Sequence, residues 1–430
     1  MPRESYYITA ADLSALGKSN IPPELLSSQH LIYSSPATLA FNSPGAQGFG
    51  VKRAALCVPG SVELLIAPGC CGRNTSALNA PEYRDRFFYL LLDETDIVTG
   101  RHLKKIPDAV CEILNFLDKK PSCVMICITC VDALLGTDME RVCRKAEEAA
   151  GVPVLPTYMY ALTREGRQPP MVSVRKTVYS LLEKRKKNPR TVNILGEFSP
   201  FYADTELFDI LREIGIKTIN EISRCEDFED YLAMAEANFN LILNPECRLA
   251  ADDLKKRLDI PGIELTRQYQ IDKIRRQYEL LGAALGVTID DSAWYKKAAE
   301  AVSVFAAEYP HTTFAVGEWM NGDPFELSLA LLRYGHSVSE IFGTVSQENF
   351  VYIRRIAELS PGTRICSNLS PSMMNYDSAV CSPDLTIGQD AAYYHPDCPN
   401  VPWNGEEQPF GYSGIRHLME ECKKALAYGR

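Results

Sequence analysis

The sequence predicts an α/β protein in which three Rossmann-like domains with parallel sheets surround a central cleft. Short apolar runs of strand length alternate with amphipathic helices along the chain, a pattern typical of parallel sheets built from βαβ units. The pattern restarts at two similar segments, Thr191-Val-Asn-Ile-Leu-Gly-Glu197 and Thr313-Phe-Ala-Val-Gly-Glu318. At roughly 100–200 residues per domain, the 430 residues suggest two to three domains.

The first domain is expected over residues 1–186. Its predicted strands are short apolar runs, and its predicted helices carry apolar residues at helical spacing. The strands are Val62–Ala67, Ser122–Ile128 and Val152–Leu155, and the helices are Ile106–Leu117 and Asp138–Ala150. Because parallel sheets bind ligands at the carboxyl ends of their strands, the residues just after the first two strands are candidate ligand contacts.

The middle domain is expected over residues 187–308, and the C-terminal domain over residues 309–430. The charged segment Glu183–Arg190, which contains a proline, is interpreted as the connection before the middle domain. The middle domain is predicted to contain the strands Thr191–Glu197 and Asn240–Asn244, a helix capped by Asp204 and ended by Gly215, and the helix Asp227–Ala237. In the last domain, Asp323 and Pro324 suit the N-cap and first turn of a helix running to Arg333.

Composition and charge exclude some classes of protein. The net charge of −10 argues against a nucleic-acid binder, which needs a basic face. The longest apolar stretch, Cys123–Gly136, contains Asp132 and is shorter than the ~20 residues of a membrane span. The N-terminus lacks the basic-then-apolar order of a signal peptide, so we expect a cytoplasmic protein.

Fourteen cysteines is a high number for a cytoplasmic protein. In a reducing compartment they serve as buried apolar residues, metal ligands or nucleophiles. Cys70, Cys71 and Cys130 each follow an apolar strand, and Cys57 precedes the first of these strands. Thiolates at strand ends suit an iron–sulfur cluster. The alternative, unconnected buried thiols, stays open on this evidence.

Two further patterns suggest other ligands, one of cysteines and one at a histidine. Cys123, Cys127 and Cys130 have the spacing of radical S-adenosylmethionine enzymes. The first two lie on one face of an apolar strand, however, which favours a role in the core. His395 is the one histidine whose setting suggests a ligand, although a surface or core role is also open. No P-loop, His-Glu-x-x-His or Gly-x-Ser-x-Gly motif is present, so the chain has no evident nucleotide site.

The cysteine segments resemble those of the nitrogenase component 1 family. Ala67-Pro-Gly-Cys-Cys-Gly72 is similar to the family's Gly-Pro-x-Gly-Cys, with Cys71 at the ligand position and Cys70 where glycine is usual. Ile128-Thr-Cys-Val-Asp132 begins a segment similar to Thr-Cys-x-x-x-x-Ile-Gly-Asp-Asp, which implies Cys130 as a ligand and Cys57 as the first of the set. The family includes molybdenum–iron protein subunits, cofactor-assembly scaffolds and tetrapyrrole reductases.

The resemblance implies a subunit of an ATP-dependent reductase. A homologous subunit, or a second copy in a homodimer, would share a 4Fe–4S or 8Fe–7S-like iron–sulfur cluster. A separate ATP-hydrolysing iron protein would supply electrons to a substrate, a second metallocofactor or a tetrapyrrole among the three domains. A non-enzymatic scaffold for metal-cofactor assembly is the alternative. A dehydrogenase using NAD is disfavoured because no Gly-x-Gly-x-x-Gly opens a domain.

The resemblance also implies that dinitrogen is not the substrate. The strand Asn240–Asn244 aligns Asn244 with the cysteine that anchors the iron–molybdenum cofactor, and a neutral amide is a poor substitute for a thiolate on iron. Cys247 would substitute only in a reshaped loop, and His395 is a candidate second ligand. Glu197 and Glu318 are the expected polar contacts at the rim of the cavity.

Overall fold

The computed structural model describes residues 4–26, 50–69, 83–159 and 168–428. Its strands form three sheets, one of six strands and two of four. The chain divides into two compact units. One comprises residues 47–200 and 215–266 and holds both four-stranded sheets; the other comprises residues 1–46, 201–214 and 267–430 and holds the six-stranded sheet.

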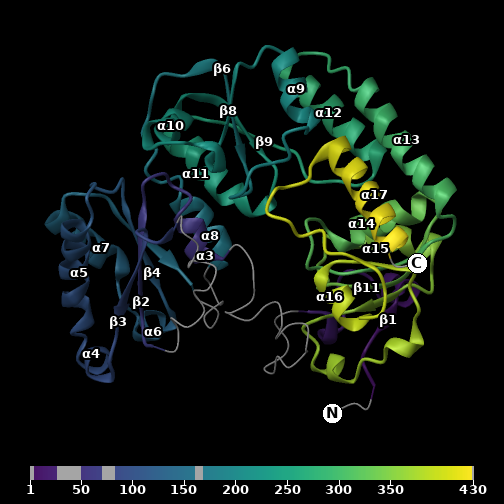
Figure 1. The fold of residues 1–430 in the computed structure, drawn as a ribbon, viewed down its shortest axis with the longest axis horizontal. Helices are drawn as coiled ribbons and strands as arrows, with labels where there is room; N and C mark the ends of the chain where they lie inside the picture. Colours follow the sequence, from purple (N-terminus) through teal and green to yellow (C-terminus); the bar gives the residue numbers. More distant parts are fainter. Residues whose placement is uncertain (1–3, 27–49, 70–82, 160–167, 429–430) are drawn as a thin grey trace. The chain divides into compact units, whose positions relative to one another are not determined.

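The first sheet has the order β3-β2-β4-β5, and all its strands are parallel. The strands are β2 (Val62–Ala67), β3 (Phe87–Leu91), β4 (Val124–Ile128) and β5 (Val154–Tyr158). The helices of this region are α3 (Val51–Ala55), α4 (Glu94–Thr99), α5 (His102–Phe116), α6 (Cys130–Leu135), α7 (Met139–Ala150) and α8 (Pro170–Thr177). Apolar residues of α5 and α7 cover one face of the sheet, and those of α3 and α8 cover the other (Figure 1).

The second sheet has the order β7-β6-β8-β9 and is also parallel. Its elements are β6 (Asn188–Leu195), α10 (Phe228–Ala233), β7 (Thr218–Glu221), β8 (Ala237–Ile242), α11 (Arg248–Leu258) and β9 (Gly262–Glu264). The two four-stranded sheets share one core, which joins Met125 of the first sheet and Val174 of α8 to Leu254 of α11. A large shared core explains why these sheets form one compact unit.

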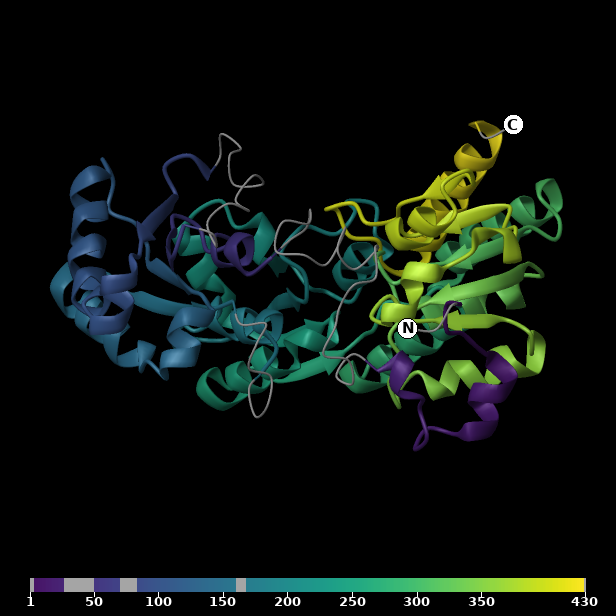
Figure 2. The ribbon, with the colours of Figure 1, turned by 90° about the horizontal axis from the view of Figure 1, so that it is seen from below.

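The third sheet has the order β1-β12-β11-β10-β13-β14, and only β1 is antiparallel to its neighbour. Its strands are β1 (Ile8–Thr9), β10 (Thr313–Val316), β11 (Ser337–Phe342), β12 (Arg364–Cys366), β13 (Leu385–Ile387) and β14 (Asn400–Val401). The helices of this unit are α1 (Ala10–Leu16), α9 (Glu206–Glu213), α12 (Ile271–Leu285), α13 (Ser292–Glu308), α14 (Pro324–Arg333), α15 (Phe350–Leu359), α16 (Gln389–Tyr394) and α17 (Gly411–Tyr428). Figure 2 shows the purple helix α1 beside α15.

A buried carboxylate holds the start of the last helix. Glu206 accepts hydrogen bonds from the backbone N–H groups of Tyr412 (2.6 Å) and Ser413 (3.0 Å) and from the Tyr278 hydroxyl (2.8 Å). The first N–H groups of a helix lack partners within the helix, and Glu206 supplies acceptors for two of them. An added Cβ at Gly411 would lie 1.8 Å from the Glu206 carboxylate, so only glycine fits there.

The predicted α/β class with parallel sheets is confirmed, with local corrections. β2 and the Asp323 N-cap of α14 match the predictions. Asp204 does not cap α9, whose N-cap is Thr205; instead Asp204 pairs with His417 at 2.9 Å. The predicted helix to Ala237 ends at Ala233 and is followed by the 3-10 turn Met234–Glu236, after which Ala237 begins β8. The domain boundaries at 186/187 and 308/309 and the central cleft stay predictions. None of the helices in the described residues is long and apolar enough to cross a bilayer.

Candidate functional site

Each sheet contains a switch point. After adding strands on one side of the first parallel strand, the chain continues on the other side of that strand. The strand orders place these points between β2 and β4, between β6 and β8, and between β10 and β13. Ligands of open α/β sheets bind at such points, beyond the carboxyl ends of the two strands. Residues that contact a ligand are therefore expected at these three positions.

At the first of these points the structure places Cys130. This residue begins α6 directly after β4, which ends at Ile128. Cys70 and Cys71 lie outside the described residues, as does the Cys130 side chain. The described part of this edge therefore contributes one cysteine, and a cluster here needs further cysteines from undescribed residues or from a partner chain.

Cys57 is not brought to this edge. It precedes the Pro59–Gly60 turn, whose carbonyl groups accept hydrogen bonds from Ser122 just before β4 (2.6 and 3.0 Å). It thus lies near the amino end of β4, whereas Cys130 follows the carboxyl end. The Cys57 thiol contacts the carbonyl oxygens of Arg53 and Phe198, each at 3.7 Å. Burial raises the pKa of Cys57 to about 12, which favours a thiol over the thiolate that iron needs.

Cys123 and Cys127 are core residues, as the sequence favours. Both are fully buried, and burial raises the pKa of Cys123 to about 12. Cys127 lies within β4 and faces Glu63, a fully buried carboxyl group whose pKa is raised well above its ordinary value by burial. A strand placed in the middle of a sheet leaves no loop to wrap a cluster, so the radical S-adenosylmethionine interpretation loses its support.

The second point brings Glu197 and Asn244 together. The Asn244 side-chain amide donates a hydrogen bond to the Glu197 carboxylate at 3.1 Å, and its oxygen accepts one from the Glu246 N–H at 3.0 Å. An added Cβ at Gly196 would lie 2.9 Å from the Asn244 backbone nitrogen. The glycine of the Gly-Glu restart therefore allows the ends of β6 and β8 to approach closely.

Arg175, which the sequence reasoning missed, organises this second site. Its side chain, only 6% exposed, comes from α8. The guanidinium donates to the Gly196 carbonyl and, at 3.1 Å, to the Glu246 carboxylate; it lies 3.7 Å from the Glu197 carboxylate. It also stacks over the Phe198 ring, 4.6 Å from the centroid. No local motif marks Arg175, because its partners follow other strands.

Cys247 lies beneath this site and not at its surface. The residue is 1% exposed and belongs to the shared core of the two four-stranded sheets. Burial raises the pKa of Cys247 to about 12, although the nearby Arg175 charge opposes the rise. The exposed donors of the site are thus carboxylate and amide oxygens, which do not suit the soft iron sites of a metallocofactor. An organic ligand fits this donor set better.

The third point holds Glu318. Its carboxylate accepts hydrogen bonds from the Thr344 N–H at 2.9 Å, after β11, and from the Asn368 amide at 3.0 Å, after β12. Asp390, at the start of α16, accepts from the Glu318 N–H at 2.9 Å and from the same Asn368 amide at 2.6 Å. Asn368 and Asp390 were not predicted, because the strand order that brings them to Glu318 is not visible in the sequence.

His395 is not part of this third site. It lies at the far end of α16, where its Nε2 contacts the Glu340 carboxylate and the Tyr376 hydroxyl, each at 2.9 Å. Arg364 lies 3.2 Å from the same carboxylate. Burial opposes ionisation of Glu340, but His395, Tyr376 and Arg364 outweigh it and lower the pKa of Glu340. The imidazole thus has buried protein partners, in keeping with a core role.

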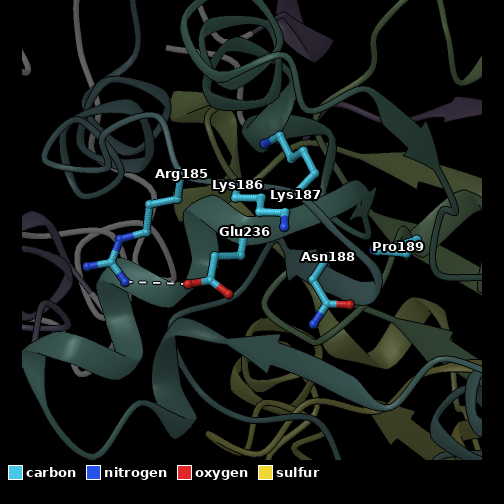
Figure 3. Close-up of a pocket in the computed structure, with 6 residues that line it drawn as sticks. All are labelled: Arg185, Lys186, Lys187, Asn188, Pro189 and Glu236. Carbon is cyan, nitrogen blue, oxygen red and sulfur yellow. Dashed lines mark ion pairs between the residues drawn. The ribbon is translucent and has the colours of Figure 1, made fainter.

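An open pocket of about 510 Å³ lies elsewhere, on the basic segment before β6. Its lining residues are Arg185, Lys186, Lys187, Asn188, Pro189 and Glu236 (Figure 3). Arg185 pairs with Glu229 at 2.6 Å and with Glu236 at 3.5 Å, and Lys187 donates to the Ala235 carbonyl at 3.0 Å. Because this pocket adjoins the amino end of β6, it lies away from the strand ends that present ligands. Among the described residues, no group of three or more histidine, cysteine, aspartate or glutamate side chains is placed to hold a metal ion.

Comparison with known proteins agrees with this architecture. The nitrogenase iron-molybdenum cofactor biosynthesis protein NifE of Nostoc sp. is 26% identical over 235 residues, which cover 53% of this chain and 48% of that protein. NifE of Mesorhizobium japonicum is 30% identical over 240 residues, covering 54% and 48%. The nitrogenase molybdenum-iron protein alpha chain of Methanosarcina barkeri is 26% identical over 158 residues, covering 35% and 29%. The chain spans about half the length of the curated NifE relatives it matches.

The fold and the family follow from two further comparisons. The solved structure of nitrogenase Cp1 at pH 6.5 superposes with a TM-score of 0.70 at 18% identity, over 95% of this chain and 96% of that one. This likeness shows a shared fold. Residues 46–427 match the model of one family along nearly the whole chain. The chain belongs to the nitrogenase component 1 type oxidoreductase family.

Proposed function

We propose that this chain is a subunit of a nitrogenase-like, ATP-dependent reductase. A separate iron protein would hydrolyse ATP and deliver electrons, and an iron–sulfur cluster held by Cys130 and Cys71 would accept and pass on single electrons. The observation that carries the proposal is the place of Cys130 at the carboxyl end of β4, in a chain whose family and fold are those of nitrogenase component 1. Since the described edge offers one cysteine, a homologous subunit or a second copy would complete the ligand set.

The proposed substrate is an organic molecule, and not dinitrogen. This part of the proposal rests on the donors beyond the strand ends of the second and third sheets, which are Arg175, Glu197 and Asn244 in the second and Glu318 in the third. In the described part of the second sheet's site, the thiol of Cys247 is buried in the core, and the Glu197 and Asn244 side chains offer hard oxygens. Arg175 would orient the carboxylates of the site, and the closely packed Gly196 backbone would limit its size. We also propose the division into three domains at 186/187 and 308/309, since the parallel strands of the second and third sheets begin after these boundaries, at Asn188 and Thr313. The antiparallel strand β1, from the start of the chain, is added to the edge of the third sheet.

A scaffold for cofactor assembly is the second candidate, because NifE proteins are described as acting in cofactor biosynthesis. A reconstitution experiment separates the two functions. The chain, its partner subunit and the iron protein would be purified without oxygen and supplied with ATP and a set of unsaturated organic compounds and tetrapyrroles. Turnover of a compound by the full mixture, lost when ATP is left out, supports the reductase. Transfer of a bound metal cofactor to an acceptor protein without turnover supports the scaffold.

A further inference from the structure

Two carboxyl groups share one amide nitrogen at the carboxyl edge of the third sheet. The Asn368 Nδ2 donates to the Asp390 carboxyl at 2.6 Å and to the Glu318 carboxyl at 3.0 Å. Asp390 is fully buried and also accepts the backbone N–H groups of Glu318 (2.9 Å) and Trp319 (3.1 Å). Glu318 is only half-buried. One of the two acids is thus wholly buried, whereas the residue that carries the other is partly exposed.

The backbone is shaped to admit the buried carboxyl group. An added Cβ at Gly317 would lie 2.0 Å from the Asp390 Oδ1. At the similar restart in the second sheet, the group nearest an added Cβ at Gly196 is instead a backbone nitrogen. The glycine of the second Gly-Glu segment therefore makes room for an acid, which the first segment does not.

No cation balances this pair of acids within the described residues. The groups that act on Asp390 are Glu318, Asn368 and two backbone N–H groups, and those that act on Glu318 are Thr344 and Asn368. These groups come from the strand ends of β10, β11 and β12 and from α16, and Glu318 and Asp390 are the only ionisable ones among them. Two carboxylates this close cannot both ionise readily without a cation. By contrast, Glu340 of the same sheet faces Arg364 and His395 and has a lowered pKa.

Burial raises the pKa of both carboxyl groups, and at Asp390 the neighbouring charge acts in the same direction. Burial raises the pKa of Asp390 to about 7, and the neighbouring Glu318 charge adds to the rise. Burial also raises the pKa of Glu318, although the hydrogen bonds from Thr344 and Asn368 act to lower it. The two groups titrate as a coupled pair, so the first proton belongs to the pair and not to either residue.

We propose that Glu318 and Asp390 hold one proton between them and that Glu318 delivers it to a ligand reduced at this edge of the sheet. The inference rests on the proposed reductase function, in which each electron added to the ligand calls for a proton. The electrons come from the iron protein. After two single electrons have reached the ligand, the Glu318 O–H bond breaks and the proton bonds to the ligand atom that carries the new electron pair, which leaves both carboxyls ionised. The second proton follows by the same route once the pair has been protonated again. Water then returns a proton to the pair. Asp390 is a positioning residue, because it acts through Glu318.

A titration of the full chain tests the shared proton without any need for activity. The infrared band of protonated carboxyl groups would be followed against pH in the wild type and in Glu318→Gln, Asp390→Asn and Glu348→Gln. Glu348, an exposed carboxylate beyond β11, is the matched control. We expect a wild-type component near pH 7 that becomes smaller in both Glu318→Gln and Asp390→Asn but is unchanged in the control. The part that remains belongs to Glu326, whose pKa burial raises to about 7. If both variants keep the wild-type titration, the pair does not exist.

The pH profile of the reductase then tests delivery. Above the pKa of the pair, wild-type turnover should fall about tenfold per pH unit, as for a single required acid. Glu318→Gln should lose this pH-dependent fall together with most of the turnover, and Asp390→Asn should move the fall to lower pH. If both variants keep the wild-type dependence of turnover on pH, Glu318 does not deliver the proton to the ligand. If no variant and no wild-type protein reduces any compound while the titration is observed, the reductase function and delivery fail, and the shared proton stands.

Discussion

The Asn244 side chain donates its amide to the Glu197 carboxylate at 3.1 Å and so joins the ends of two neighbouring strands, β6 and β8. The same residue caps the turn after β8, because its oxygen accepts the Glu246 N–H. Asn244 stands where the family's dinitrogen-reducing members are expected to carry an anchoring cysteine. In this chain the position is used to hold the site itself together.

The first prediction concerns this contact. Asn244→Asp keeps the oxygen that caps the turn but replaces the donor with a carboxylate facing Glu197, so like charges would repel. We expect the free energy of unfolding to fall by about 0.5–1.5 kcal/mol in urea titrations, the net contribution of a typical hydrogen bond. Asn20→Ala, which removes an exposed amide bonded to the Leu16 carbonyl, should change it by less than about 0.5 kcal/mol. If the two changes lower the free energy of unfolding equally, the hydrogen bond between Asn244 and Glu197 does not stabilise the fold.

The second prediction concerns Arg175. Arg175→Met removes the buried charge that links Gly196, Glu197 and Glu246. It should lower the free energy of unfolding by about 1–3 kcal/mol, because the buried Gly196 carbonyl loses its hydrogen-bond donor. Arg185→Met is the matched control, since its pairs with Glu229 and Glu236 lie at the surface. The free energy of unfolding of that variant should fall by less than about 1 kcal/mol. If the two variants unfold at the same urea concentration, the buried contacts do not organise the site.

The third prediction concerns the cluster ligands. Iron and acid-labile sulfide in protein purified without oxygen should be lost in Cys71→Ala and Cys130→Ala. Cys57→Ala should retain them, because the partly buried Cys57 lies near the other end of β4 and its thiol has a raised pKa. Cys247→Ala is a second buried-thiol control. Loss of iron in Cys57→Ala would restore this residue to the ligand set.

The fourth prediction concerns pH and Glu326. Burial raises the pKa of this carboxyl to about 7, against hydrogen bonds from Gln270 and Tyr269. An acid whose pKa is raised by folding stabilises the fold fully below its unfolded pKa, near 4.5, and this stabilisation is lost as pH rises through about 7. The free energy of unfolding measured between pH 5 and 8 should therefore fall less steeply in Glu326→Gln than in the wild type. An unchanged slope would show that Glu326 does not titrate in this range.

The sequence predicts the elements better than it predicts the contacts among them. β2 and the Asp323 cap are set by short apolar and capping patterns, which depend on adjacent residues only. The meeting of Arg175 with Glu246, or of Asp390 with Glu318, depends on the order of strands in a sheet. His395 shows the same limit, since its buried partner Glu340 belongs to another strand. The Gly-Glu repeat marks two of the three strand ends, but not the side chains that converge on them.

The proposed function requires electrons to pass from an iron protein to a cluster bound by this chain, at the expense of ATP. Electron paramagnetic resonance of the chain with its partner subunit, the iron protein and ATP tests it most directly. We expect a reduced-cluster signal that appears only with both the iron protein and ATP and is absent in Cys130→Ala. A signal of equal strength with NADH alone, or one unchanged in Cys130→Ala, would contradict the account.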